Sequence, residues 1–331
     1  MTYQHGDVVQ YFEQIVLPLV ETCFPVLARK MSVLIEGSVG LGLHDEWSDL
    51  DAMIYLDDPL WLEQGGQLQL LMMHGLPVFS PRSEPHCAFP GEPRKWAVSG
   101  HPEINVHPVS WLLDHHAQEF RALDGGPPWE AVGIEALYAL QHDLVLRDPS
   151  GVLSQLRDAT SEVRYPSWLW KKQLILKLSS QKGEPLDFEK AVARQDLAGA
   201  SIVLGTLLQN LLEIGFLVEQ RYYPWRKHLW GAYRQLPIAG QMGPDLHVLA
   251  TEPDWTKRVT ALQALVWGYT DLIIERGILS SEMLEDLPAA KNGAAWSNPA
   301  WRTEPSRLGE IAGHAGYDAQ DGWVWGLWRW A

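Results

Sequence analysis

Two aspartates separated by one leucine, Asp49 and Asp51, are the residues of this sequence best suited to binding a metal. They lie in DLDAMIYLDD (49–58), whose β-rich pattern predicts a strand, so both carboxylates should project from one face while Leu50 points into the core. Two neighbouring carboxylates repel each other unless a divalent cation lies between them. The spacing therefore predicts a site for Mg²⁺ or Mn²⁺.

A glycine and a serine, Gly37 and Ser38, end the preceding β-rich run MSVLIEG (31–37) and begin a loop. Glycine allows the backbone to approach a phosphate closely, and Ser38 can donate its hydroxyl and its backbone N–H to phosphate oxygens. Ser48 lies at the other end of the loop, beside Asp49. A phosphate-binding turn beside a metal-binding pair is suited to transferring a nucleotidyl group.

A third carboxylate is expected from the strand in PEINVHPVSWLL (102–113). Alternation places Ile104 and Val106 in the core and Glu103 on the opposite face. Glu103 is the candidate for a third metal ligand or for the base that deprotonates an acceptor hydroxyl. His107 and His101 share its face and are second candidates.

Composition excludes several classes of protein. The 331 residues are 46% hydrophobic and 20% charged, which is a globular balance. We expect no spanning helix, since no apolar stretch of about 18 residues without charge is evident, and no signal peptide at the N-terminus. Two cysteines are too few for a disulfide framework, and a cytoplasmic protein fits best. The net charge of −15 argues against nucleic acid and favours a small, cationic partner.

The pattern of elements changes along the chain and predicts an α+β protein. A small α/β module over 1–123, with a mixed sheet and helices on one face, precedes an all-helical module over 129–287. The stretch DGGPP at 124–128 predicts the boundary. Long helices are expected at 130–144, 166–182, 186–220, 222–236 and 254–279. The tail 288–331 holds six of the 17 tryptophans, which suit either docking or stacking on a flat ligand.

These residues resemble the nucleotidyltransferase superfamily that includes DNA polymerase beta and the aminoglycoside nucleotidyltransferases. Its pattern is Gly-Ser, a short loop with a glycine, Ser-Asp-x-Asp, and a later acid on a strand. The chain matches it with Gly37, Ser38, Gly42, Ser48, Asp49, Asp51 and Glu103. The resemblance implies that 1–123 is the catalytic domain of a metal-dependent nucleotidyltransferase, whose co-substrate is a nucleoside triphosphate.

The helical half is similar to a bacterial family called domain of unknown function 4037, through RYPSWLWKKQ (164–173), ARQDLAGAS (193–201) and RYYPWRKHLWGAYRQLP (221–237). The resemblance implies that this half contributes cationic or aromatic side chains to the nucleotide. Lys227 is the candidate for a triphosphate contact, with Arg226 and Arg194 behind it. These cations equally suit a solvated helix face or ion pairs with Asp196.

The leading hypothesis is a Mg²⁺-dependent enzyme that moves a nucleoside monophosphate, AMP by default, to a hydroxyl of a small molecule. Two rival hypotheses stay open. One is a toxin-like enzyme that modifies a protein, and the other is a catalytically silent nucleotide-binding protein. The acceptor, the preferred base and the oligomeric state do not follow from the sequence.

Overall fold

A computed structural model describes residues 9–43, 50–75, 102–109, 129, 133–180 and 184–279. Ser48, Asp49 and His101 lie outside the described residues, and so do the boundary 124–128 and the tryptophan-rich tail 288–331. The chain divides into two compact units, Met1–Arg164 and Tyr165–Ala331.

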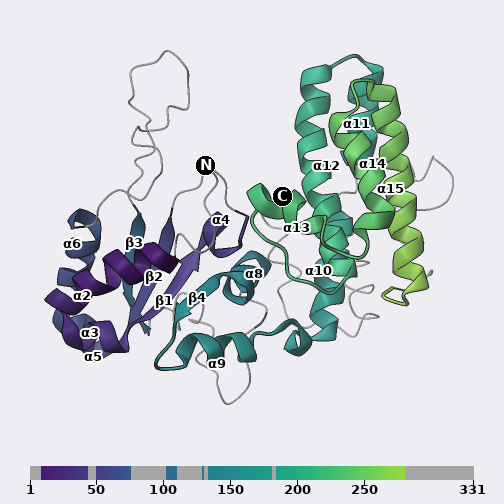
Figure 1. Cartoon of the computed structure of the whole chain (residues 1–331). Coiled ribbons are helices and arrows are strands. Elements are labelled where there is room, and N and C mark those ends of the chain that lie inside the picture. Colours follow the sequence, from purple (N-terminus) through teal and green to yellow (C-terminus); the bar gives the residue numbers. More distant parts are fainter. Residues whose placement is uncertain are drawn as a thin grey trace, which may run out of the picture. The chain divides into compact units, whose positions relative to one another are not determined.

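The first unit is built on a four-stranded mixed sheet in the order β3-β2-β1-β4 (Figure 1). Strands β1 and β2 are antiparallel, as are β1 and β4, whereas β2 and β3 run parallel. The strands are β1 (Ser32–Glu36), β2 (Asp51–Leu56), β3 (Glu103–Pro108) and β4 (Leu144–Arg147). The three strands expected from the sequence are confirmed, and β4 completes the sheet.

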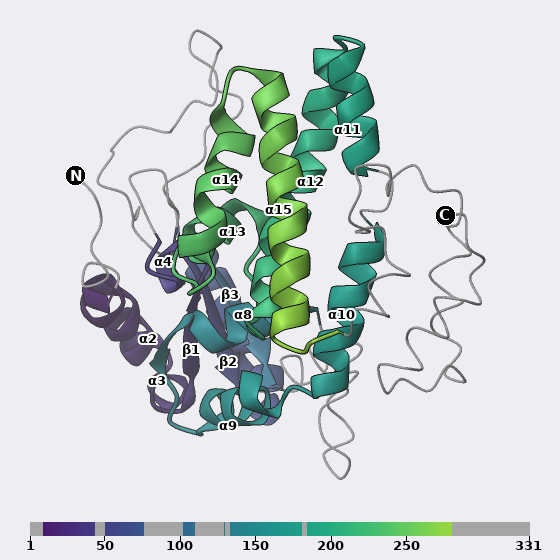
Figure 2. The same cartoon turned by 90° about the vertical axis from the view of Figure 1, so that its right-hand side faces the viewer.

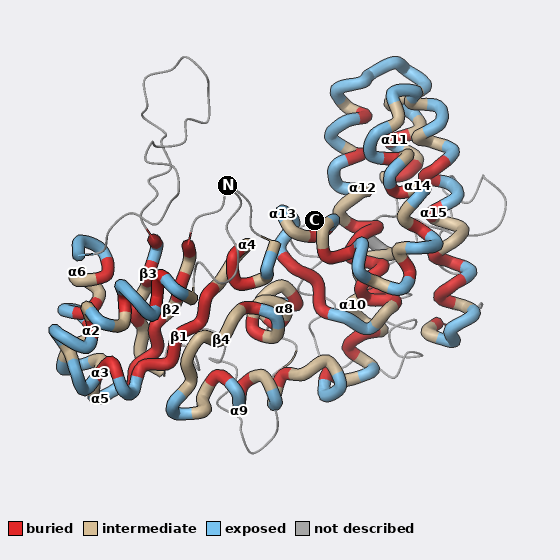
Figure 3. Tube along the Cα trace, in the orientation of Figure 1, coloured by how far each residue is buried: buried red, intermediate tan, exposed pale blue. Residues whose placement is uncertain are grey.

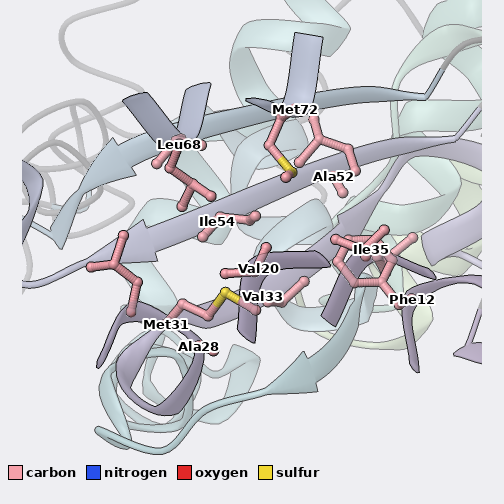
Figure 4. Packing of buried hydrophobic residues seen from close by; sticks show 14 of the residues in the cluster. Phe12, Val20, Ala28, Met31, Val33, Ile35, Ala52, Ile54, Leu68 and Met72 are labelled. Carbon is pink, nitrogen blue, oxygen red and sulfur yellow. The ribbon is translucent and has the colours of Figure 1, made fainter. Parts of the chain in front are cut away.

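Helices lie against both faces of this sheet. On one face, buried residues that include Phe12, Val20, Ile35, Ile54 and Leu68 form the main core (Figure 4). This core joins the sheet to the π-helical turns η1 (Phe12–Val16) and η2 (Trp61–Gly65) and to α2 (Leu17–Cys23), α3 (Pro25–Lys30), α5 (Asp58–Leu60) and α6 (Gly66–His74). The α+β class with a small mixed sheet is therefore confirmed.

The second face of the sheet is covered by α8 (Ile134–His142) and α9 (Val152–Ala159). Leu34 and Tyr55 from the sheet pack there with Leu140, Leu153 and Leu156. Helices on one face alone were expected, because nothing local in the sequence ties these later helices to the sheet. Since β4 pairs with β1, the first unit ends at Arg164 rather than at 124–128.

The second unit is helical (Figure 2). Helix α11 packs on α12, and α14 packs on α15. The helices are α10 (Ser167–Ser180), α11 (Glu184–Ala193), α12 (Leu197–Val218), α13 (Arg226–Tyr233), α14 (Ala239–Thr251) and α15 (Trp255–Glu275). The single helix expected at 186–220 is broken, because Gln195 has φ +59° and the Asp196 side chain caps a new helix by accepting the Gly199 N–H.

Helix α12 is long and apolar enough to cross a membrane by length and composition, which corrects the expectation that no such segment exists. However, 61% of its apolar window is buried within the protein (Figure 3). Its Glu213 is 2% exposed and forms an ion pair with Lys177 of α10. A buried ion pair and buried apolar side chains are typical of a core helix.

Candidate active site

The register of the sheet places three carboxylates in one row. Glu36 at the end of β1 lies opposite Asp51 of β2, and Asp51 lies opposite Glu103 of β3. Residues that face each other on neighbouring strands project from the same face, with Cβ atoms about 5 Å apart in an antiparallel pair. Glu103 is exposed, whereas Glu36 and Asp51 are half-buried. The predicted neighbours Asp51 and Glu103 are therefore brought side by side.

A fourth carboxylate extends this row. Ile35 pairs with Leu144, so the next position outward joins Glu36 to Asp143, an extended residue directly before β4. Asp143 is only 3% exposed. Its Oδ1 atom has no hydrogen-bond partner among the described residues, and it lies 3.0 Å from where a Cβ on Gly40 would be. We call Glu103, Asp51, Glu36 and Asp143 the acid row.

Sequence reasoning missed Glu36 and Asp143 as members of this site. Glu36 was visible as the acid immediately before Gly37 in VLIEGS. Asp143 was not recognisable, because its place depends on the pairing of β4 with a strand more than 100 residues earlier in the chain.

The Gly37-Ser38 turn lies directly on the acid row. Gly37 has φ +66°, and a Cβ at this position would be 3.0 Å from Oδ2 of Asp51. Glycine is thus required both by the backbone conformation and by the close approach. The turn continues as the short helix α4 (Gly37–Gly40), which leaves Ser38 half-buried beside the acids.

Arg157 of α9 fixes the end of α8 from which Asp143 projects. Its Nε donates to the carbonyl oxygen of Leu140 at 2.6 Å, and its Nη2 donates to the carbonyl oxygen of Asp143. Gln141 adds a second link, since its Nε2 donates to Oγ1 of Thr160 at 2.9 Å. These hydrogen bonds fix the backbone at Asp143 and thereby position its buried carboxylate.

The acid row has unusual electrostatics. Burial, followed by the charge of Asp51, raises the pKa of Glu36 to about 7. Burial and the charge of Glu36 raise the pKa of Asp143 to about 8, although the Arg157 guanidinium acts in the opposite direction. The native fold thus penalises the joint ionisation of Glu36 and Asp143 at neutral pH.

The donor chemistry of the row fits a hard divalent cation. All its donors are carboxylate oxygens, which Mg²⁺ prefers, and Mg²⁺ is usually held by one or two carboxylates while keeping several waters. The missing side chain at Gly37 and the unpartnered oxygen of Asp143 both lie at this end of the sheet. Within the described ranges, which omit Asp49, no group of three or more His, Cys, Asp or Glu residues could hold a metal ion, so the row offers Asp51 as one ligand and not a complete set of carboxylates.

The candidate nucleotide contacts of the helical unit are exposed. Lys227 lies in the first turn of α13, and Arg194 lies in the turn after α11. In the part of the chain that the structure describes, Arg194 forms no ion pair with Asp196, whose side chain instead caps α12.

The aromatic residues that precede α13 fall into two groups. Tyr222 and Tyr223 are buried, and the Tyr222 ring lies 5.4 Å from that of Trp170, so both serve the core. Trp225, at the N-terminus of α13, is 65% exposed and is available to a ligand.

Comparison with known proteins finds a family that matches part of the chain and distant solved structures. Residues 129–230 match the model of a family described as domain of unknown function (DUF4037). A nucleotidyltransferase-like protein from Exiguobacterium sibiricum is 12% identical, with 81% of this chain and 79% of that chain covered, at a TM-score of 0.32. None of the curated proteins matches the sequence. Residues 129–230 are therefore similar to the DUF4037 family, in agreement with the resemblance seen in the sequence.

Proposed function

We propose that the protein is a Mg²⁺-dependent nucleotidyltransferase, which transfers a nucleoside monophosphate, AMP by default, from a nucleoside triphosphate to a hydroxyl of a small molecule. The observation that carries this proposal is the close approach of the Asp51 carboxylate to Gly37, where a Cβ would lie 3.0 Å from Oδ2, within a row of carboxylates. This arrangement supports a site at one end of the sheet in which the turn would bind phosphate and the carboxylate would hold a cation. We further propose that the protein works in the cytoplasm.

Each residue of the site has a proposed task. Asp51, together with Asp49, would hold the cation, and Glu103 would complete the site or accept the proton of the acceptor hydroxyl. Gly37 and Ser38 would bind the β- and γ-phosphates with backbone and hydroxyl donors. The bound cation supplies charge neutralisation on the triphosphate.

The reaction balances without a further reactant. The acceptor oxygen forms a bond to the α-phosphorus as the bond between this phosphorus and the β-bridging oxygen breaks. The hydroxyl proton passes to a carboxylate, for which Glu103 is the candidate, and pyrophosphate leaves. Lys227 and Arg194 would stabilise the negative charge of the triphosphate, and Ser48 would contribute to the phosphate-binding loop.

Pyrophosphate release tests the proposal. Full-length protein is incubated with Mg²⁺ and each of the four common nucleoside triphosphates, with candidate acceptors that carry hydroxyl and amino groups. Asp51→Asn should reduce release at least about 100-fold, because it removes a charge that the transition state requires. Asp57→Asn, an exposed aspartate just after the same strand, is the matched control. Undiminished release in folded Asp51→Asn protein would refute the site.

A further inference from the structure

The exposed face of α13 carries cations and indole rings in a regular pattern. Arg226, Trp230 and Arg234 follow one another at intervals of four residues, which places them on one helix face about 6 Å apart along the axis. Lys227 is exposed beside them. Trp225, which begins the helix, is 65% exposed and Trp230 is 37% exposed. We call these five residues the α13 face.

The buried side of α13 holds this face in position. Leu229, Ala232 and Tyr233 are buried in the helical unit. The ring of Trp230 stacks on that of Tyr233, with centroids 6.1 Å apart and planes inclined by 8°. One surface of the Trp230 ring therefore has a partner, and its orientation is fixed before any ligand arrives.

The charge of the α13 face differs from that of the whole chain. From Gln220 to Pro244 the sequence has four Lys or Arg residues and no Asp or Glu. Residues 165–279 contain 13 Lys or Arg and 11 Asp or Glu, which is a net charge of +2. Since the whole chain has a net charge of −15, all its other residues together carry −17. Among the described residues, Arg226, Lys227 and Arg234 form no ion pair.

We propose that the α13 face binds single-stranded nucleic acid, with its cations on successive phosphates and its indole rings against unstacked bases. Arginine pairs well with phosphate, and base stacking on aromatic rings tolerates any sequence. The expectation against nucleic acid came from the average charge of the chain, which does not describe this surface. Lys227 is the one member of the α13 face that also has a task in the proposed transfer reaction, and the inference rests on the other four, so it does not depend on that chemistry.

The composition of the α13 face favours nucleic acid over a membrane. Its large apolar groups are the two indole rings, since Leu229 is buried, and α13 presents no exposed aliphatic side chain for insertion between lipids. The carboxylates of an acidic protein would pair with the cations of the α13 face but would leave the exposed Trp225 ring without a stacking partner.

Binding can be measured without catalysis. Full-length protein is titrated into a 5′-fluorescein-labelled 12-nucleotide oligouridylate or oligoadenylate in EDTA, and anisotropy is recorded at several salt concentrations. Trp225→Ala should weaken binding about 5- to 100-fold, the range found for losing one stacked base. Its side chain makes no cap hydrogen bond, so the variant should melt like the natural protein. Arg234→Gln should lower the slope of log affinity against log salt by about 0.7.

Matched controls separate this surface from general charge effects. Lys190→Gln removes an exposed cation of the same unit, outside α13, and should leave the affinity unchanged. Inorganic polyphosphate supplies the charge without bases, ATP supplies a single base, and vesicles of phosphatidylcholine and phosphatidylglycerol supply an anionic membrane. Three results would each overturn the proposal. Polyphosphate could compete as well as unlabelled oligonucleotide does, or ATP or vesicles could bind where the oligonucleotide does not. Trp225→Ala could also bind the oligonucleotide as tightly as the natural protein does. Loss of pyrophosphate release with oligonucleotide binding retained would refute only the proposed enzyme.

Discussion

Replacing Asp143 by asparagine should stabilise the sheet unit above neutral pH, although it removes a buried polar charge. Burial and Glu36 raise the pKa of Asp143 from 3.8 to about 8, whereas Arg157 opposes the rise. The native state therefore binds this proton more tightly than the unfolded state. As the pH rises from about 4 to about 8 the unfolded chain loses the proton first, so the free energy of unfolding falls across this window. Below pH 4 both states are protonated and the penalty vanishes.

The size of the effect follows from the same values. A rise of about four in pKa corresponds to about 5 kcal/mol at most. The asparagine amide stays buried with no partner for its oxygen, which costs about 1–3 kcal/mol. We therefore expect the substitution to raise the free energy of unfolding by about 2–4 kcal/mol at pH 9 and to lower it by about 1–3 kcal/mol at pH 4, where only the cost of the buried amide remains.

Hydrogen–deuterium exchange tests this prediction within the unit that contains Asp143, Met1–Arg164. Peptides that cover β1 and β4 should exchange more slowly in Asp143→Asn than in the natural protein at pH 9, after correction for the intrinsic rate. Asp158→Asn, an exposed aspartate on α9, serves as the control for a lost charge. Two results would show that Asp143 is not an uncompensated buried acid. One is faster exchange in Asp143→Asn at pH 9, and the other is exchange slowed equally at pH 9 and at pH 4.

Three further substitutions test other parts of the structure. Gly37→Ala should destabilise the sheet unit by about 1–2 kcal/mol and abolish nucleotide-dependent thermal stabilisation, since its φ is +66° and its Cβ would lie 3.0 Å from the Asp51 carboxylate. Lys227→Ala should raise KM for the triphosphate about 10- to 100-fold while the melting temperature stays constant, since the side chain is exposed; a lower melting temperature with KM unaltered would assign Lys227 to the fold. Gln220→Gly should raise the free energy of urea unfolding by about 0.5–1 kcal/mol, because Gln220 has φ +53° after α12; destabilisation would show that its side chain contributes contacts.

The elements that the sequence predicts correctly are those with a local signature. Short β-rich runs identified β1, β2 and β3. The α15 boundaries, Trp255–Glu275, lie within the expected 254–279 because Asp254 caps the helix by accepting the Thr256 N–H. Local hydrogen bonding and hydrophobic period therefore specify these elements without knowledge of the tertiary fold.

The features that escape prediction depend on residues distant in the chain. Strand β4 has four half-buried residues after a helix, which is too short a pattern to identify. Asp143 joins the acid row beside Glu36 only because β4 pairs with β1. Glu36 lies opposite Asp51 only because of the register of β1 against β2. Of the candidate site, the sequence predicted Gly37, Asp51 and Glu103 as neighbours, since these lie on elements it could identify.

The position of β4 affects how the protein can be divided for experiments. The DUF4037 match begins at residue 129, so it includes α8, β4 and α9 of the sheet unit as well as α10, α11 and α12 of the helical unit. A fragment cut to the match would contain one strand without its neighbour, and the remaining N-terminal piece would expose the free edge of β1. Unpaired strand edges promote association between chains. The segment recognisable by its sequence is therefore not a unit that can fold alone, and a soluble fragment should instead be cut between Arg164 and Tyr165.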